Sequence, residues 1–269
     1  MDDITLISTG LGLVVGLVLA LTGAGGTILA IPLLVFSLGL SVQEAAPVAL
    51  LAILVASSIG ALQGLRKGIV RYKAAMLIAL LGVLCAPVGV LLAHWLPSAM
   101  LNGIFAGILI AVAFRTWKHA HLIDESNSNA PPPACAINPA TSTLFWTAPC
   151  TRSLIATGGL AGLLSGLLGV GGGFVVVPSL QRVTNFTQAT IVATTLAAVA
   201  LISISSLAAY SAKSNIEWQI AIPFTISTTL VMLALNSVRD KIPVAFSQKG
   251  FALLCFIAAI SLAVNAVQV

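Results

Sequence analysis

The sequence predicts an all-α polytopic integral membrane protein built from two inverted repeats, and three observations support this fold class. Of the 269 residues, 59% are hydrophobic and 7% are charged, whereas a soluble domain carries about a quarter charged residues. The chain also offers one apolar run after another of the roughly 20 residues that a transmembrane helix needs. Finally, a glycine-rich segment occurs twice, at residues 16–34 and at residues 162–180.

The first apolar run is expected to stay in the mature protein. It follows Met1-Asp2-Asp3 and lacks the basic n-region of a cleaved secretory signal. The net charge of +5 lies in short basic clusters between apolar runs, which is typical of the orientation signal of membrane proteins. We therefore expect the lipid bilayer, and not nucleic acid, to be the partner of this chain.

The four cysteines form no CxxC pair. Cys85 and Cys255 lie inside apolar runs and are interpreted as small packing residues. Cys135 and Cys150 lie in or beside the central polar stretch, and nothing in the sequence requires them to bond to each other.

The two glycine-rich segments are copies of one pattern. Residues 16–34 read GLVLALTGAGGTILAIPLL, and residues 162–180 read GLLSGLLGVGGGFVVVPSL. Eight of the nineteen aligned positions are identical, including four glycines and one proline (Pro32 and Pro178). The same offset of 146 residues aligns Tyr72 with Trp218. These matches indicate a duplication.

Between the copies the composition changes to a Ser/Asn run followed by Pro131-Pro132-Pro133. A polar, proline-rich stretch of this kind is typical of a linker outside the bilayer. We therefore expect a first membrane repeat over residues 1–118, a linker over residues 119–151 and a second membrane repeat over residues 152–269.

The glycine clusters divide each opening apolar run into two pieces, of about 18 residues each within residues 4–40. Each pair could be one broken span or a re-entrant hairpin. If each pair crosses the bilayer once, the Lys and Arg residues divide 8 to 4 between the two sides. If each pair is a hairpin followed by three full spans, they divide 11 to 1, with Lys213 alone. The positive-inside bias favours the hairpins.

Three full spans in each half make the second half enter from the opposite face, so the repeats are predicted to be inverted. Inverted repeats with discontinuous helices are a recurring transporter design, with the substrate near the midplane between the halves. The basic side and its linker are expected to be cytoplasmic. Both termini are expected outside, in a multi-pass protein of the cell (inner or plasma) membrane.

A break in a membrane helix leaves backbone groups unpaired, so it must be buried or line a cavity. The helices that follow the breaks are expected to begin at about Thr27 and Phe174, and helix N-termini suit an anion. Glycine clusters also mark close helix packing, but the duplication with a proline favours a ligand-lining role. The glycines with this predicted role are Gly23, Gly25, Gly26, Gly169, Gly171, Gly172 and Gly173.

Hydroxyl groups are the next candidates, because they donate to an anion without the cost of a buried charge. Those in or near the spans around the breaks are Thr22, Thr27, Ser57, Ser58, Thr194 and Thr195. The alternative is that they only bond their own backbone or a neighbouring helix.

Ionisable residues are scarce in the apolar runs. Glu44 and Glu217 are the only carboxylates near the predicted spans, and both lie close to helix ends. A proton relay has no evident carrier, and a coupling ion (H⁺ or Na⁺) is not identified. Export of an anion needs none, since the membrane potential supplies about 2.3 kcal/mol per charge per 100 mV. No cofactor or metal site is predicted, and a homodimer is left open.

The second-half pattern GLLSGLLGVGGGFVVVP, with its weaker first-half copy, resembles the sulfite exporter TauE/SafE family, also called TSUP. The resemblance covers nearly the whole chain. It implies transport of sulfur-containing or organic anions such as sulfite, sulfoacetate, thiosulfate or related sulfonates, without choosing among them. Ala24 and Thr27 replace Val170 and Gly173 in the first copy, which distinguishes the first site from the second.

Two other classes of protein are weighed against a transporter. Ser165-Gly166 is similar to the motif of an intramembrane serine protease, but all three histidines precede it, so no general base follows in a later span. An anion channel or a non-transporting membrane scaffold is the other alternative. The sequence therefore predicts a secondary transporter, acting as an exporter, and not an enzyme.

Overall fold

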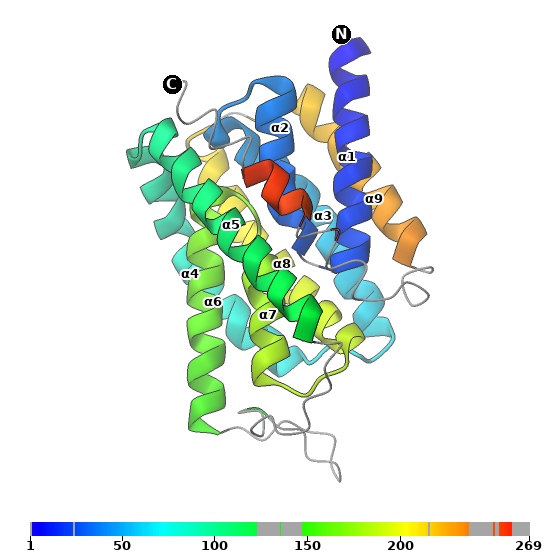
Figure 1. Cartoon of the computed structure of the whole chain (residues 1–269), viewed down its shortest axis with the longest axis vertical. Coiled ribbons are helices and arrows are strands. Elements are labelled where there is room, and N and C mark those ends of the chain that lie inside the picture. The colour runs from blue at the N-terminus through cyan, green and yellow to red at the C-terminus, as the bar shows by residue number, and fades with distance from the viewer. Residues whose placement is uncertain are drawn as a thin grey trace.

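In the computed structural model the described residues are 2–23, 25–122, 135, 147–214, 216–236, 250 and 253–259, and nearly all of them are helical (Figure 1). Of the named helices, those long and apolar enough to cross a membrane are α1 (Asp2–Thr22), α3 (Val42–Arg66), α4 (Tyr72–Trp95), α6 (Ala148–Leu168), α8 (Gln188–Ser211) and α9 (Trp218–Asn236). The others are the 3₁₀ helix η1 (Gly25–Leu29), α2 (Ala30–Leu38), α5 (Ser98–Leu122) and α7 (Gly173–Val183). This architecture confirms an all-α polytopic membrane protein.

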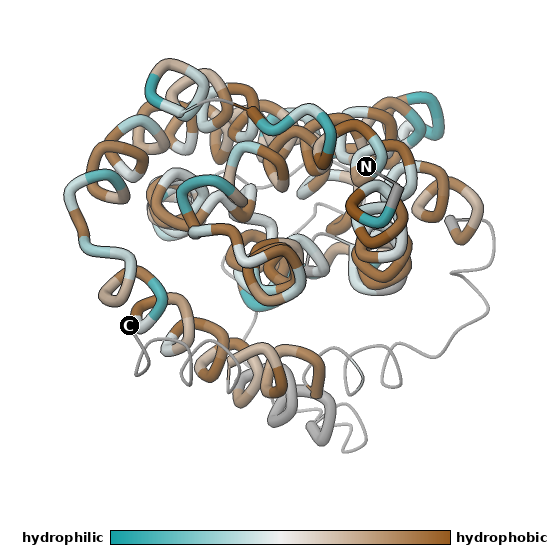
Figure 2. Tube along the Cα trace, turned by 90° about the horizontal axis from the view of Figure 1, so that it is seen from above, coloured by the Kyte–Doolittle hydropathy of each residue, from teal (hydrophilic) through white to brown (hydrophobic). Residues whose placement is uncertain are grey.

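The outward faces of the bundle are apolar, as contact with lipid requires. On α4 the exposed side chains include Met76, Leu80, Leu84, Val88 and Leu91, which recur every three to four residues and so share one helix face. Viewed end on, hydrophobic residues dominate the helices of the bundle (Figure 2). In a soluble protein this much exposed apolar surface would be an aggregation liability.

Local sequence signals set several helix ends. Ser41 and Glu44 form a capping box at the start of α3, in which each side chain bonds the other residue's backbone N–H. Thr187 caps α8 by accepting from the N–H of Thr190. At C-termini, Gly39 after α2 and Gly169 after α6 adopt the left-handed conformation, which glycine takes at little cost.

The helix bounds recur at the offset that the sequence alignment gave. Adding 146 to the bounds of α1, 2–22, gives 148–168, which are the bounds of α6. The same sum moves the start of α3 from 42 to 188, where α8 begins, and the start of α4 from 72 to 218, where α9 begins. The expected linker, residues 119–151, lies mostly outside the described residues, with α5 reaching Leu122 and α6 starting at Ala148.

Helices of one half pack mainly against helices of the other half. The principal pairs are α1 with α9, α4 with α6, and α3 with α8. The offset converts α1 into α6 and α9 into α4, so the first two pairs are equivalent, and α3 with α8 lies between the halves. Each half therefore packs its first helix against the other half.

The paired helices run parallel, which fixes the direction of both hairpins. Along α1, Gly12 meets Phe224 and Gly16 meets Thr228 of α9, so the residue numbers rise together. Along α6, Gly158 meets Ile78 and Gly162 meets Gly82 of α4 in the same way. Because α4 and α9 start at opposite ends of the bundle, α1 and α6 also run in opposite directions (Figure 1).

The described Lys and Arg residues, apart from Lys213 and those at the end of α5, gather at one end of the bundle, which we call the basic end. The α3–α4 turn lies there beside the α7–α8 turn: the backbone N–H of Arg71 donates to Thr194 at 3.1 Å, and its guanidinium lies 5.8 Å from the ring centroid of Phe186. Lys213 lies at the opposite end, where the neighbouring Ser214 contacts His94. The basic residues are Arg66, Lys67, Arg71, Lys73, Arg152 and Arg182.

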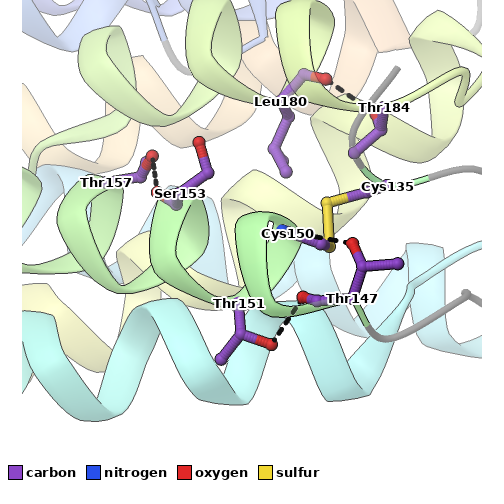
Figure 3. The surroundings of a disulfide bond; sticks show 8 residues. All are labelled: Cys135, Thr147, Cys150, Thr151, Ser153, Thr157, Leu180 and Thr184. Carbon is purple, nitrogen blue, oxygen red and sulfur yellow. Dashed lines mark hydrogen bonds between the residues drawn. A yellow bond between two sulfur atoms is a disulfide. The ribbon is translucent and has the colours of Figure 1, made fainter. Parts of the chain in front are cut away.

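Cys135 and Cys150 form a disulfide, which the sequence did not require (Figure 3). Their Cα atoms lie 5.0 Å apart, and both side chains are buried. Cys135 also donates its backbone N–H to the carbonyl of Val183 at 2.8 Å. The disulfide and this hydrogen bond together connect the first turn of α6 to the end of α7, at the foot of the second hairpin at the basic end.

Close packing of α6 on α4 depends on the missing side chain of Gly162. A Cβ at this position would clash with the backbone of Gly82, whereas a Cβ on the neighbouring Gly159 would meet only the Cys85 sulfur at 3.8 Å. Gly162→Ala is expected to lower the free energy of unfolding by about 1–3 kcal/mol through overpacking. Gly159→Ala is the matched control and should be neutral or gain up to about 1 kcal/mol from helix propensity. Thermal unfolding in detergent measures both, and equal midpoints would contradict the packing.

The disulfide is expected to stabilise the purified protein. Its two cysteines are 15 residues apart, and a loop of this size contributes about 3 kcal/mol when closed. The double variant Cys135→Ser/Cys150→Ser should unfold at lower temperature than the wild type without reductant, and Cys85→Ser, which leaves the bond intact, should not. Thiol titration of the denatured, unreduced protein should find only Cys85 and Cys255 free; four free thiols would refute the bond.

Candidate functional site

The second glycine break presents an uncapped helix N-terminus. Gly169, Gly171 and Gly172 have φ values of +70°, +70° and +73°, a left-handed conformation that L side chains rarely adopt. This run turns the chain from α6 into α7, which begins at Gly173, close to the predicted Phe174. Gly172 is the N-cap of α7 and offers no side-chain cap. The N–H groups of Val175 and Val176 donate to the Gly172 carbonyl, so the N–H groups that lack a capping side chain are those of Gly173 and Phe174. Groups of this kind at a helix N-terminus favour an anion.

The first break is built differently: the helical stretch that follows it begins near the expected Thr27, but as a 3₁₀ helix. The α-helix α2 begins at Ala30, not at about Thr27, because the five residues of η1 form a 3₁₀ helix that takes up Thr27. Only Gly23, with φ +85°, has positive φ among the described glycines of this break. A 3₁₀ turn already bonds backbone groups that an α-helix N-terminus leaves free. The two breaks also differ in sequence at this point: the first copy has Thr27 where the second copy has Gly173.

Both breaks are buried between the two halves. A Cβ at Gly23 would clash with Val192 of α8, and a Cβ at Gly169 would clash with Ala46 of α3. Val192 and Ala46 are themselves 146 residues apart, so the two contacts are equivalent. The 3₁₀ helix of the first break also contacts α7 of the second. The unpaired backbone groups of both breaks are thereby kept away from lipid.

The predicted glycines divide into three structural roles. Gly23, Gly169, Gly171 and Gly172 turn the chain. Gly26 packs against the backbone of Val18 and Leu19 in α1, Gly25 opens η1, and Gly173 opens α7. The glycines outside the breaks, such as Gly12 and Gly162, serve helix packing, as small residues do in membranes.

The predicted hydroxyls are not all in one place. Thr22 donates to the carbonyl of Val18 in its own helix, and Ser57 donates to that of Leu54 at 3.3 Å. Thr194 accepts from Arg71 near the basic end. Ser58 is exposed, so it does not lie with the buried group. Thr27 is buried within η1, and Thr195 is buried with no hydrogen-bond partner for its hydroxyl.

Ser203 is a polar residue at the second break that sequence reasoning missed. Its side chain is fully buried, and its Oγ has no hydrogen-bond partner. This oxygen lies 3.2 Å from where a Cβ on Gly171 would stand. A buried hydroxyl without a partner costs about 1–3 kcal/mol, so its position beside the break is informative. The 146-residue offset maps Ser203 onto Ser57, and applying it to the hydroxyl candidates would have found this residue.

The geometry around Ser165 is not that of a protease. Ser165 Oγ lies 2.9 Å from Ser206 Oγ, so its partner is another hydroxyl and not a base. His94 contacts the carbonyl of Val90 and the hydroxyl of Ser214. Among the residues that the structure describes, no group of three or more His, Cys, Asp and Glu side chains is arranged to hold a metal ion.

A shallow pocket of about 480 Å³ opens at the basic end, beside the disulfide. The described residues that line it belong to the first turns of α6, namely Ala148, Pro149, Arg152 and Ser153. The positive charge of Arg152 and the N-terminal end of the α6 dipole both favour anions in this pocket. It lies at the foot of the hairpin whose apex is the second break.

Comparison with known proteins identifies relatives of the chain. A sequence model of the sulfite exporter TauE/SafE family matches residues 8–262. Two proteins of Xylella fastidiosa, from strains Temecula1 and 9a5c, are each 28% identical over 225 residues, which cover 82% of this chain and 79% of the relative. Both carry the name "Probable membrane transporter protein". No solved structure matches.

Proposed function

Because the chain belongs to the sulfite exporter TauE/SafE family of membrane transporters, we propose that it is a secondary exporter of small sulfur-containing or organic anions, such as sulfite, sulfoacetate, thiosulfate or other sulfonates. The substrate binds near the midplane between two inverted repeats, at the second glycine break. The observation that carries this proposal is the uncapped N-terminus of α7, with the unpartnered hydroxyl of Ser203 lying against Gly171, two residues before α7 begins.

The chemistry of this break suits a transported anion. The N–H groups at the start of α7 and the hydroxyl of Ser203 are neutral donors, and the helix dipole adds about half a positive charge. Glycine at position 171 lets an anion approach the backbone closely. The described residues of this break carry no full positive charge, which favours release of the anion, as transport requires.

The direction of transport follows from charge and potential. The basic end attracts anions to the foot of the second hairpin, where Arg152 lines the pocket. With the basic end in the cytoplasm, a negative interior drives an anion outward by about 2.3 kcal/mol per charge per 100 mV. Export then needs no coupling ion.

Purified protein in liposomes tests this function. Flux under a set membrane potential is measured for sulfite, thiosulfate, sulfoacetate, taurine, sulfate and lactate. We expect saturable flux of one sulfur anion that rises with the potential. Flux that does not saturate would identify a channel, and flux of none of these anions by folded protein would leave a scaffold as the better description.

Gly171 provides the sharpest test of the binding site. Gly171→Leu and Gly25→Leu should abolish flux while the protein stays folded. For a finer comparison, Gly171→Ala should reduce flux at least about tenfold, equivalent to about 1.4 kcal/mol, because its Cβ would contact Ile53, Val199 and Ser203.

Gly39→Ala is the matched control for this substitution. Gly39 has φ +66°, close to the +70° of Gly171, so an alanine brings similar backbone strain. However, a Cβ at Gly39 would meet nothing within 4 Å. Equal flux in the two alanine variants would mean that the second break does not bind the substrate.

A further inference from the structure

One face of α8 carries hydroxyl groups from the second break to the end of the bundle opposite the basic end. Ser203, Ser206 and Tyr210 are spaced by three and four residues, so they share a helix face. All three are fully buried. Ser214 follows four residues later, in the turn after α8, where its N–H donates to the carbonyl of Tyr210 at 2.8 Å. We call these four residues the hydroxyl file.

Each member of the file meets a polar group or the glycine break. Ser203 lies beside Gly171, and Ser206 bonds Ser165 of α6. The Tyr210 hydroxyl lies 3.5 Å from the carbonyl of Leu167, and its ring centroid lies 5.6 Å from that of His94. His94 Nε2 lies 3.4 Å from the hydroxyl of Ser214. Polar groups thus form a row from the break to the turn that carries the exposed Lys213.

The first half shows that the fold does not need these hydroxyls. Subtracting 146 converts Ser203 into Ser57 but converts Ser206 and Tyr210 into Gly60 and Gly64. A Cβ at Gly60 would clash with Met232 and Leu196, and one at Gly64 would clash with Ala193. Apolar side chains of the other half therefore fill the corresponding face of α3. Likewise the position of Ser165 holds Leu19 in the first half.

We propose that the hydroxyl file is the path by which the anion leaves the second glycine break, with Ser203, the Ser165–Ser206 pair and Tyr210 donating in turn to its oxygens. The path ends at His94, Ser214 and Lys213. This inference rests on the proposed function, and it assigns the exit route to one half of a duplicated scaffold. The substrate class is an oxyanion with several acceptor oxygens, since one oxygen must be held while the next donor is reached.

Flux measurements on single variants test the file. Ser206→Ala and Ser165→Ala should lower the maximal flux about fivefold to tenfold, the loss expected for one neutral hydrogen bond. The half-saturating concentration should stay near the wild-type value, because the break itself is intact. Tyr210→Phe, which removes only the hydroxyl, should act in the same direction.

Two serines of α8 that point elsewhere are the controls. Ser205 donates to the carbonyl of Val83 in α4 at 2.9 Å, and the exposed Ser211 donates to that of Leu207. Ser205→Ala and Ser211→Ala should keep wild-type flux. If the file variants also keep wild-type flux, or if both groups lose it equally, the file is not the path.

Cysteine labelling tests the path without relying on flux. In a Cys85→Ser/Cys255→Ser background, Ser206→Cys should react with a small water-soluble thiol reagent added at the end opposite the basic end, and Ser205→Cys should not. Burial alone predicts the reverse order, since Ser206 is fully buried and Ser205 is only partly buried. Faster labelling at position 205 would overturn the proposal.

The two experiments separate the two levels of inference. Absence of flux in the folded wild type would refute the proposed function, whereas the labelling order would still decide whether an aqueous path follows α8. Wild-type flux with unchanged file variants and no labelling at position 206 would refute only the path.

Discussion

The structure depends on one constraint: backbone polar groups cannot face lipid unpaired. A helix that breaks inside an apolar bundle exposes N–H and C=O groups at a cost of several kcal/mol each unless protein surrounds them. Here the surroundings of each break come from the other half, since Gly23 packs against Val192 and Gly169 against Ala46. Neither hairpin could be stable without the opposite half, and this explains why the helices are exchanged and not packed as two separate bundles.

The same constraint allows the two halves to differ in chemistry. Once the scaffold buries both breaks, only one of them has to keep donors available. In the first half the 3₁₀ helix bonds its own backbone and glycines at positions 60 and 64 accept apolar side chains. In the second half α7 begins without a cap, and hydroxyls line α8. The duplicated architecture thus supports an asymmetric polar interior, in which the proposed substrate site lies in the second copy alone.

Much of this architecture could be predicted from the sequence, because its signals are local or repeated. Apolar length predicts spans, and the fixed offset predicts equivalent helices, so the starts at Tyr72 and Trp218 agree with the pattern. The start of α2 could not be predicted, because the choice between a 3₁₀ and an α-helical turn at Thr27 depends on packing against α1. The disulfide could not be predicted, because it depends on how close in space two cysteines 15 residues apart come. The composition of the stretch between them does not determine that distance. The contact between Ser206 and Ser165 could not be predicted either, because it depends on how α6 and α8 are aligned along each other.

The disulfide and the basic residues lie at the same end of the molecule but indicate different compartments for it. Lys and Arg bias that end toward the cytoplasm, where disulfides are mostly transient, whereas a persistent disulfide indicates an oxidising compartment. The orientation bias comes from many charges and not from one bond. The basic residues favour the orientation in which this end faces the cytoplasm, and the redox state of the compartment at this end governs whether the bond persists. The disulfide joins Cys135 to the first turn of α6, and the Cys135 N–H donates to the Val183 carbonyl at the end of α7. The bond thus connects, through residue 135, the two helices of the hairpin whose apex carries the uncapped N-terminus of α7.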